Sequence, residues 1–413
     1  MTPDPVPWPD SPPPTRPPLD SGEQSSVQPV TPGGSAGAVT EAQIDAVLPP
    51  EALPKLPIVD TDYVRFFRGP RFRWWKSLLA LVAVGFAWVI VGSVLILVGY
   101  ALDGIDLVQM AVSATISIGP WSFLANNVAL ALCIPLTWLA AWAILGQRPR
   151  WLASVVGGIR WAWLWRVGAI VLPIWVVLSV IAFIMEPDMD MRWRSHSLLM
   201  IVGILLTTPL QAAGEEYLIR GFLVRCVGSW IRPELAAFTV STLVGSAVFM
   251  SLHGAGDPWL NAFYFVFGAV GSWLTWRTGG LEAAIALHVI NNLLGEIFMP
   301  FVDFSEMFDR GVGAGDPSLL LNMGFLVATG VLLDFYSRRQ GLVVRSAPGL
   351  EALAAARSHY RTWLTHQGGV APAAESNVPA GQRPDSGSVV DPGPQPPASG
   401  STPPPTGPAG PGY

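Results

Sequence analysis

The sequence predicts an all-α fold: a polytopic membrane helix bundle of about eight transmembrane helices, with disordered, proline-rich tails at both ends. Three observations support this prediction. Hydrophobic residues fill 51% of the 413 positions and charged residues only 13%, about half the charged fraction of an average soluble domain. Apolar runs of roughly 17 to 25 residues recur through the middle of the chain. The 39 prolines concentrate near its two ends.

The overall charge excludes one class of partner. The chain has 24 Lys and Arg against 29 Asp and Glu, a formal net charge of −5, so it lacks the broad basic field that nucleic-acid binding requires. Its two cysteines, Cys133 and Cys226, lie in apolar runs without CxxC spacing. They predict neither a disulfide framework nor a thiolate metal cluster.

Residues 1–60 and 368–413 are the two predicted tails. Both are poor in the aromatic and branched apolar residues that a folded core would bury, so ordering them would not recover the conformational entropy lost. We expect disordered segments with polyproline II character that serve as solvated spacers. Recruitment of a partner protein is the alternative.

Between the tails, eight apolar runs have about the length that a bilayer-spanning helix needs. They are Leu78–Tyr100, Leu124–Leu145, Val167–Met185, Leu198–Gly228, Ala236–His253, Trp259–Trp276, Leu281–Phe298 and Leu319–Phe335. The fourth is too long for a simple span and should tilt, kink at Pro209 or extend beyond the lipid. We divide this part into N-terminal transmembrane helices (61–196), a core (197–300), a last transmembrane helix (301–345) and a short cytoplasmic helix (346–367).

Loop charges predict the orientation of these spans. Basic residues precede the first run and recur in every second loop, whereas the alternate loops are mainly acidic. The basic positions include Arg65, Arg71, Arg148, Arg150, Arg225, Arg277, Arg338 and Arg339. By the positive-inside rule both termini face the cytoplasm, and the chain is a multi-pass protein of the cell membrane with an even number of spans.

Ionisable residues inside the spans mark the candidate functional site, because a charge at mid-bilayer costs at least about 2.5 to 3.5 kcal/mol. The first three runs contain none, whereas the later ones carry Glu215, Glu216, Arg220, His253, Glu282, His288 and Glu296. Glu216 and Arg220 are spaced i, i+4 and can form an ion pair. Glu215 lies about 100° away around the helix and needs another partner.

These groups can meet inside the bundle. Counting about 1.5 Å per residue from the basic ends, Glu215, His253 and His288 reach overlapping depths. His288 shares a helix face with Asn292, and Phe249 shares one with His253, because each pair is spaced i, i+4. We therefore expect one carboxylate, two imidazoles and a carboxamide around one water-filled pocket.

The expected chemistry is amide hydrolysis without a covalent intermediate. A desolvated Glu215 can act as a general base for water that His253 positions, while His288 and Asn292 can donate hydrogen bonds to the oxyanion. There is no GxSxG elbow and no Cys paired with His. A divalent metal such as zinc, held by Glu215, His253 and His288, remains open, although no HExxH motif is present.

Three motifs in order resemble the CPBP family of intramembrane proteases, also called the CAAX protease and bacteriocin-processing or Abi family, related to Rce1-type prenyl-protein endopeptidases. They are EExxxR at Glu215–Arg220, FxxxH at Phe249–His253 and HxxxN at His288–Asn292. The resemblance covers approximately residues 197–294. It implies an intramembrane endopeptidase, sometimes named a metalloprotease, that cleaves membrane-associated proteins or peptides.

The resemblance also implies roles for single residues. Glu215 would be the base, His253 its partner, and His288 with Asn292 the oxyanion stabilisers, supported by Glu216, Arg220 and Phe249. Two other functions stay open. A proton-coupled transporter could use Glu215, His253 and His288 as a relay, and a non-catalytic membrane scaffold could use its tails to bind partners.

Overall fold

The computed structural model describes residues 39–113, 117–185, 191–302 and 310–367. The elements in chain order are α1 (Glu41–Val47), η1 (Pro50–Ala52), β1 (Thr61–Asp62), η2 (Tyr63–Arg65), α2 (Trp74–Asp103), α3 (Leu107–Ser113), α4 (Pro120–Ala131), α5 (Cys133–Ala140), η3 (Ala141–Leu145), α6 (Arg150–Ala153), α7 (Trp161–Met185), α8 (Ser197–Glu216), η4 (Tyr217–Val224), α9 (Arg225–Trp230), α10 (Glu234–Leu252), α11 (Pro258–Thr278), α12 (Glu282–Gly295), α13 (Leu319–Arg339), β2 (Arg345–Ser346) and α14 (Leu350–Gln367). The first two η elements are 3₁₀ helices, and the last two are π-helical.

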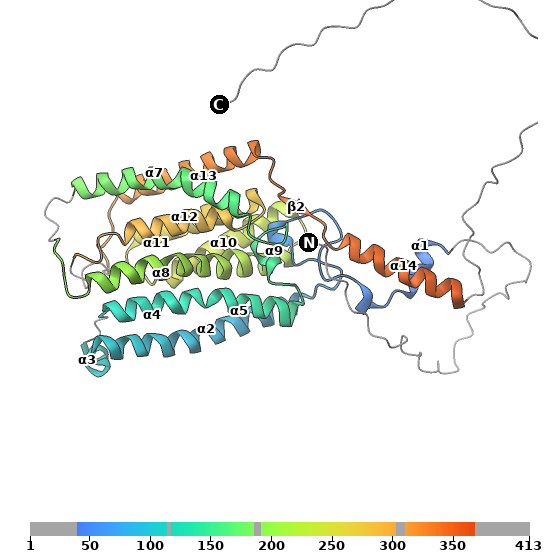
Figure 1. The fold of residues 1–413 in the computed structure, drawn as a ribbon, viewed down its shortest axis with the longest axis horizontal. Helices are drawn as coiled ribbons and strands as arrows, with labels where there is room; N and C mark the ends of the chain where they lie inside the picture. Colours follow the sequence, from blue (N-terminus) through green and yellow to red (C-terminus); the bar gives the residue numbers. More distant parts are fainter. Residues whose placement is uncertain (1–38, 114–116, 186–190, 303–309, 368–413) are drawn as a thin grey trace, which may run out of the picture. The chain divides into compact units, whose positions relative to one another are not determined.

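The predicted all-α membrane bundle is confirmed (Figure 1). Among the described residues, six helical segments are long and apolar enough to cross a membrane: Trp74–Asp103, Pro120–Leu145, Trp161–Ile181, Ser197–Trp230, Glu234–Leu252 and Leu319–Arg339. The other two expected spans form helices α11 and α12. Helix α12 has 14 residues, about 21 Å at 1.5 Å per residue, less than the hydrocarbon thickness of about 30 Å.

Helix α12 is enclosed by other helices of the bundle. It packs against α7, α8 and α11, and every residue of its first half, from Glu282 to His288, is buried. On the other side of α8 lies α4, which separates α8 from α2 (Figure 1). The bundle thus has outer helices facing lipid and an inner helix that carries polar groups.

The long fourth run remains helical from Ser197 to Trp230. Pro209 lies inside α8 and does not end it. The winding changes instead directly after Glu216, where eight residues form the π-helical segment η4. Such segments are rare and occur frequently at functional sites.

The prediction of a disordered N-terminal tail over residues 1–60 is wrong for residues 39–60. Thr40 caps helix α1, Ile44 is fully buried, and Arg357 of α14 forms an ion pair of 2.7 Å with Asp45. The composition of residues 1–60 as a whole does not reveal the short stretch that forms α1 and contains the apolar and charged side chains for these contacts. Residues 1–38 and the predicted tail 368–413 lie outside the described residues.

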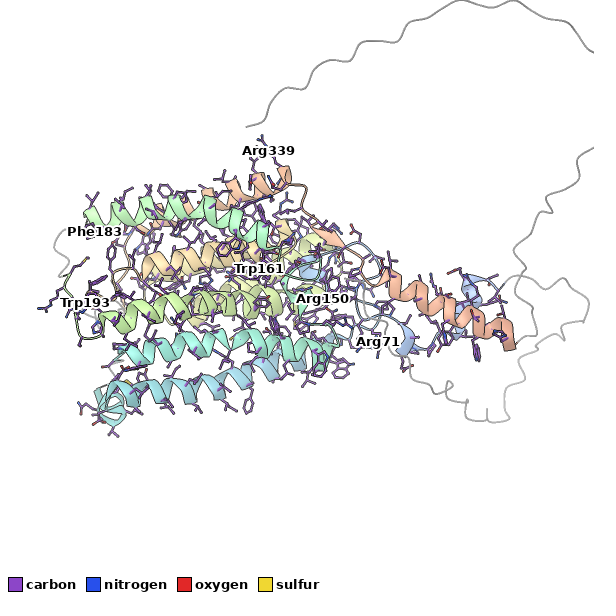
Figure 2. All side chains as sticks on the ribbon, viewed as in Figure 1. Arg71, Arg150, Trp161, Phe183, Trp193 and Arg339 are labelled. Atoms are coloured by element: carbon purple, nitrogen blue, oxygen red, sulfur yellow. The ribbon has the colours of Figure 1, made fainter. Side chains whose placement is uncertain are left out.

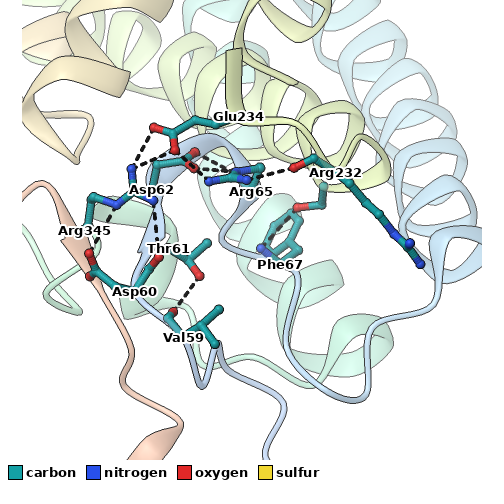
Figure 3. Close-up of polar contacts among 10 residues, drawn as sticks. Val59, Asp60, Thr61, Asp62, Arg65, Phe67, Arg232, Glu234 and Arg345 are labelled. Carbon is teal, nitrogen blue, oxygen red and sulfur yellow. Dashed lines mark hydrogen bonds and ion pairs between the residues drawn. The ribbon is translucent and has the colours of Figure 1, made fainter. Parts of the chain in front are cut away.

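Ion pairs join three distant segments at one end of the bundle (Figure 3). Glu234, the first residue of α10, accepts hydrogen bonds from Arg65 (3.0 Å) and from Arg345 of β2 (2.7 Å). Strand β2 pairs antiparallel with β1. The segment before α2 and the segment after α13 are therefore held together beside α10.

Basic loops gather at this same end. Figure 2 shows Arg71, Arg150, Trp161 and Arg339 toward one end of the bundle, and Phe183 and Trp193 at the opposite end. The chain is a multi-pass membrane protein by its six candidate spans. Which membrane face the basic end meets stays a prediction.

Candidate active site

The site begins with a buried ion pair at the junction of α8 and η4. Glu216 and Arg220 are both fully buried, and Arg220 Nη1 lies 2.7 Å from Glu216 Oε1. Arg220 Nη2 donates to the backbone oxygens of Phe267 (3.3 Å) and Gly268 (3.1 Å) on α11. The guanidinium thus neutralises Glu216 and links η4 to α11.

Two residues of neighbouring helices shape the space around this guanidinium. The Arg220 group lies over the ring of Phe249 at 4.7 Å, a cation–π contact with α10. On α11, a Cβ atom at Gly271 would come within 2.8 Å of Arg220 Nη2. A side chain at this position would require the arginine head group to shift.

His288 on α12 stands between the two glutamates. Its Nδ1 is 2.8 Å from Glu216 Oε1, and its Nε2 is 3.7 Å from Glu215 Oε2. An ionised carboxylate only accepts hydrogen bonds, so Nδ1 carries a hydrogen and donates it in the hydrogen bond to Glu216. The buried carboxylate therefore sets the tautomer and orientation of the ring, and Nε2 faces Glu215.

Aromatic rings close the sides of His288. The ring of Phe267 meets it edge to face at a centroid distance of 4.9 Å, and the ring of Phe249 does so at 5.8 Å. The imidazole is consequently fixed by one hydrogen bond and by packing on two faces.

A glutamine connects Glu215 to Asn292. Gln211 Nε2 donates to Glu215 Oε1 at 2.5 Å, and Asn292 Nδ2 donates to Gln211 Oε1 at 3.0 Å. The side chain of Glu215 is 13% exposed, whereas that of Glu216 is fully buried. Glu215 is therefore the carboxylate that remains accessible within the site.

His253 follows the last turn of α10. Its Nδ1 donates to the Phe249 carbonyl at 2.8 Å, since a carbonyl can only accept, which leaves Nε2 to face other groups. The ring stacks on Tyr264 of α11 at 3.9 Å and contacts Phe249 at 4.6 Å. Phe249 thus touches both imidazoles.

Comparisons with known proteins identify the region that contains this network. Residues 195–294 match the model of a family described as type II CAAX prenyl endopeptidase Rce1-like. This segment is similar to that family, and we call it the Rce1-like domain. Its boundaries include Glu215, His253, His288 and Asn292, while helices α2 to α7 precede it.

One known protein is similar to this chain in sequence, but its name states no function. The chain is 26% identical over 177 residues to the "Uncharacterized protein YyaK" of Bacillus subtilis (strain 168), covering 41% of this chain and 58% of the relative. The chain therefore spans less than two thirds of that protein. No solved structure matches. The description of the matched family is that of an endopeptidase.

The structure brings most of the predicted site residues of the Rce1-like domain into one network. Glu216, Arg220 and His288 share direct contacts, Glu215 faces His288, and Asn292 joins through Gln211. His253 joins through Phe249 and Tyr264. The expected pair of Glu216 and Arg220 is present, and Glu215 has the separate partners that the helix geometry required.

Sequence reasoning missed three members of the network: Gln211, Tyr264 and Phe267. Gln211 precedes Glu215 by four residues, the spacing of neighbours on one helix face. That spacing predicts a contact between Gln211 and Glu215. The aromatic residues gave no such signal, because rings are common in membrane helices.

The proposed metal ligands do not gather as a ligand set. Among the described residues no group of three or more His, Cys, Asp and Glu side chains is arranged to hold a metal ion. Nδ1 of His288 and Nδ1 of His253 are both engaged in hydrogen bonds, so Nε2 is the ring nitrogen of each that could face an ion. We therefore derive no step that involves a metal.

Proposed function

We propose that this protein is a CAAX-protease-like intramembrane endopeptidase in which Glu215 activates water to hydrolyse a peptide bond of a membrane-associated protein. One observation supports this proposal above the others. Inside an apolar bundle, His288 contacts two carboxylates, of which Glu216 is neutralised by Arg220 and Glu215 is not. A carboxylate without an arginine partner, beside an oriented imidazole, is a suitable general base.

Glu215 takes the proton of the attacking water in this mechanism. Gln211 holds one of its oxygens, so the other oxygen, which faces His288, is the atom that receives the proton. The water oxygen attacks the peptide carbonyl, and the proton is then delivered to the leaving amine. His253, oriented by the Phe249 carbonyl, positions the water through its second ring nitrogen.

Asn292 and His288 stabilise the oxyanion. Asn292 uses one of its two amide hydrogens on Gln211, and the other is available for the developing charge. His288 already donates a hydrogen bond from Nδ1 to Glu216. It can donate from Nε2 only as the imidazolium, so this role requires both ring nitrogens to be protonated in the reacting complex.

The orientation of the protein is part of the proposal. With Arg71, Arg150 and Arg339 at one end of the bundle (Figure 2), we place that end in the cytoplasm of a cell, with the chain in the cell membrane. The cytoplasmic helix expected at residues 346–367 corresponds to α14.

The decisive experiment compares wild-type protein with the Glu215→Gln variant in lipid vesicles that contain membrane-delivered peptides, both prenylated and unmodified. Mass spectrometry identifies the cleaved products. Cleavage by the wild type that the variant loses supports the proposal. Equal cleavage by both proteins, or transport of solute without cleavage, overturns it. The same assay after dialysis against a chelator should retain activity, because the histidines and Glu215 do not form a ligand set.

A further inference from the structure

A second polar feature lies at the basic end of the bundle, outside the Rce1-like domain. A cavity of about 160 Å³ is bordered by the start of α2 and the end of η3. Its lining includes four cationic side chains, those of Lys55, Arg71, Arg73 and Lys76, together with Phe72 and Gln147. We call this cavity the basic pocket.

The cations of the basic pocket have no carboxylate partner among the described residues. Arg71 and Arg73 donate only to backbone oxygens, those of Glu51 (3.2 Å) and Phe72 (3.0 Å). Burial, together with the positive charges of Arg71 and Lys76, lowers the pKa of Lys55. Four like charges thus line one concavity without an internal counterion.

Several other arginines at the same end are paired with carboxylates. Arg65 pairs with Asp62 and Glu234, and Arg345 pairs with Glu234. Arg160 pairs with Glu282. The basic pocket differs from these pairs, because its four cations lie together without a carboxylate partner in the described residues.

The lining of the basic pocket includes a buried polar side chain and a glycine that packs against Lys55. Gln147 is 3% exposed and its Nε2 donates to the Lys55 carbonyl at 3.1 Å, while its Oε1 is buried with no partner in the described part of the chain. Gly146 has φ of +68°, and a Cβ atom there would overlap Lys55 Nζ. The helix end is thus shaped to admit the lysine head group.

The basic pocket lies at the depth of lipid headgroups. It is located where two candidate membrane spans end, Trp74–Asp103 and Pro120–Leu145. Trp75 and Trp142 are 50% and 62% exposed beside it. Exposed tryptophans at span ends are typical of the membrane–water interface, so the anions nearest to this pocket are the phosphates of phospholipids.

We propose that the basic pocket binds the phosphate headgroup of an anionic phospholipid. Arg71 and Arg73 can donate to the phosphate oxygens in the forked geometry that guanidinium groups provide, and Lys55 and Lys76 add positive charge. The proposal is independent of the protease chemistry, because it involves none of the site residues.

The test uses the full chain in detergent micelles doped with phosphatidylglycerol or with phosphatidylcholine, and native mass spectrometry to count retained lipid. The double variant Arg71→Gln/Lys76→Gln removes two pocket charges. The control Arg148→Gln/Arg339→Gln removes two charges that do not line the basic pocket. Soluble glycerol phosphate, added without lipid, tests whether a free phosphate compound suffices.

We expect the pocket variant to weaken phosphatidylglycerol retention at least about tenfold and the control less than threefold, because each basic side chain contributes to the attraction of an anionic surface. Equal weakening in both variants, or equal retention of phosphatidylcholine by the wild type, overturns the proposal. Binding of glycerol phosphate as tightly as lipid also overturns it. If the double variant fails to fold, the single exposed change Arg73→Glu provides the same comparison.

Discussion

Two fully buried glutamates, Glu282 in helix α12 and Glu216 beside it, differ in how many of their carboxylate oxygens accept hydrogen bonds. Glu282 begins the helix and receives Arg160 on both oxygens, at 2.9 and 2.6 Å. Glu216 meets the helix at His288 and uses one oxygen, Oε1, for both His288 and Arg220. Its Oε2 is buried with no hydrogen-bond partner among the described residues.

This difference separates a structural pair from a candidate functional one. A bidentate pair with both oxygens occupied offsets its own desolvation and mainly holds two segments together. A carboxylate that uses one oxygen for both an arginine and a histidine instead fixes the orientation of the histidine ring. The second ring nitrogen can then contact another group. Buried charge alone therefore does not identify the active site, whereas incomplete pairing beside a second carboxylate does.

The largest expected effect is on catalysis by Glu215. The Glu215→Gln variant should lower the rate of peptide cleavage by about 10² to 10⁴-fold, the usual contribution of a general base. Its thermal stability should change little, since the side chain has no arginine partner in the described structure. Initial rates in lipid vesicles and a melting curve of the same preparation measure both quantities. A variant that keeps more than a tenth of the wild-type rate would contradict the role.

The matched pair Glu216→Gln and Glu282→Gln tests the comparison directly. Glu216→Gln leaves the fully buried Arg220 without its carboxylate and should destabilise the protein by about 3 to 5 kcal/mol. Glu282→Gln should cost less, because the side chain of Arg160 is 15% exposed. Only Glu216→Gln should alter the pH profile of the cleavage rate per folded molecule, because only Glu216 orients His288. Rates measured against pH, normalised to the folded fraction, check this. Identical profiles for the two variants would mean that Glu216 is merely structural.

Gln211→Leu should have a moderate effect. It removes the hydrogen bonds to Glu215 and from Asn292, and a bond to a charged group contributes about 1.5 to 3 kcal/mol, so we expect a loss of rate of at least about tenfold. Gln147→Leu is the matched control, because it alters a buried glutamine remote from the site residues. If both variants lose activity equally, the effect of Gln211 is not one of positioning.

Arg345→Ala should have the smallest effect. Arg345 and Glu234 are about one third exposed, and ion pairs that solvent reaches contribute about 0 to 1 kcal/mol. We expect a loss of stability within this range, further reduced by high salt, and an unchanged cleavage rate. Chemical denaturation at low and high salt measures the difference. A strong loss of activity would show that the ion-pair network in Figure 3 acts on the site.

Much of the site could be predicted because membrane burial makes polar residues conspicuous. Within apolar runs, Glu215, Glu216, Arg220 and His288 stood out by their cost in lipid, and the i, i+4 rule correctly paired Glu216 with Arg220. The same logic overlooked Gln211, whose neutral amide costs less in lipid. The contact between His288 and Glu216 joins residues 72 positions apart, which no local spacing rule can specify.

Arg225 illustrates what loop charges do not reveal. In the sequence it belongs to the basic residues expected at the membrane boundary, but it is fully buried. Its guanidinium lies 4.4 Å from the ring of Tyr63, with Phe66 and Phe67 at 5.1 and 4.7 Å. Those rings belong to the segment before α2, far away along the chain. A charge assigned to orientation thus also holds that segment against α9.

The amino-acid sequence by itself determined the membrane bundle, because long apolar runs can satisfy their backbone groups in lipid only as helices. It also determined which polar residues had to find partners away from lipid. Only the tertiary structure decided that α12 is enclosed by other helices, that His288 stands between two carboxylates, and that four cations share the basic pocket. These outcomes depend on which helices pack side by side, and packing is set by the shapes of whole surfaces rather than by spacing along one segment.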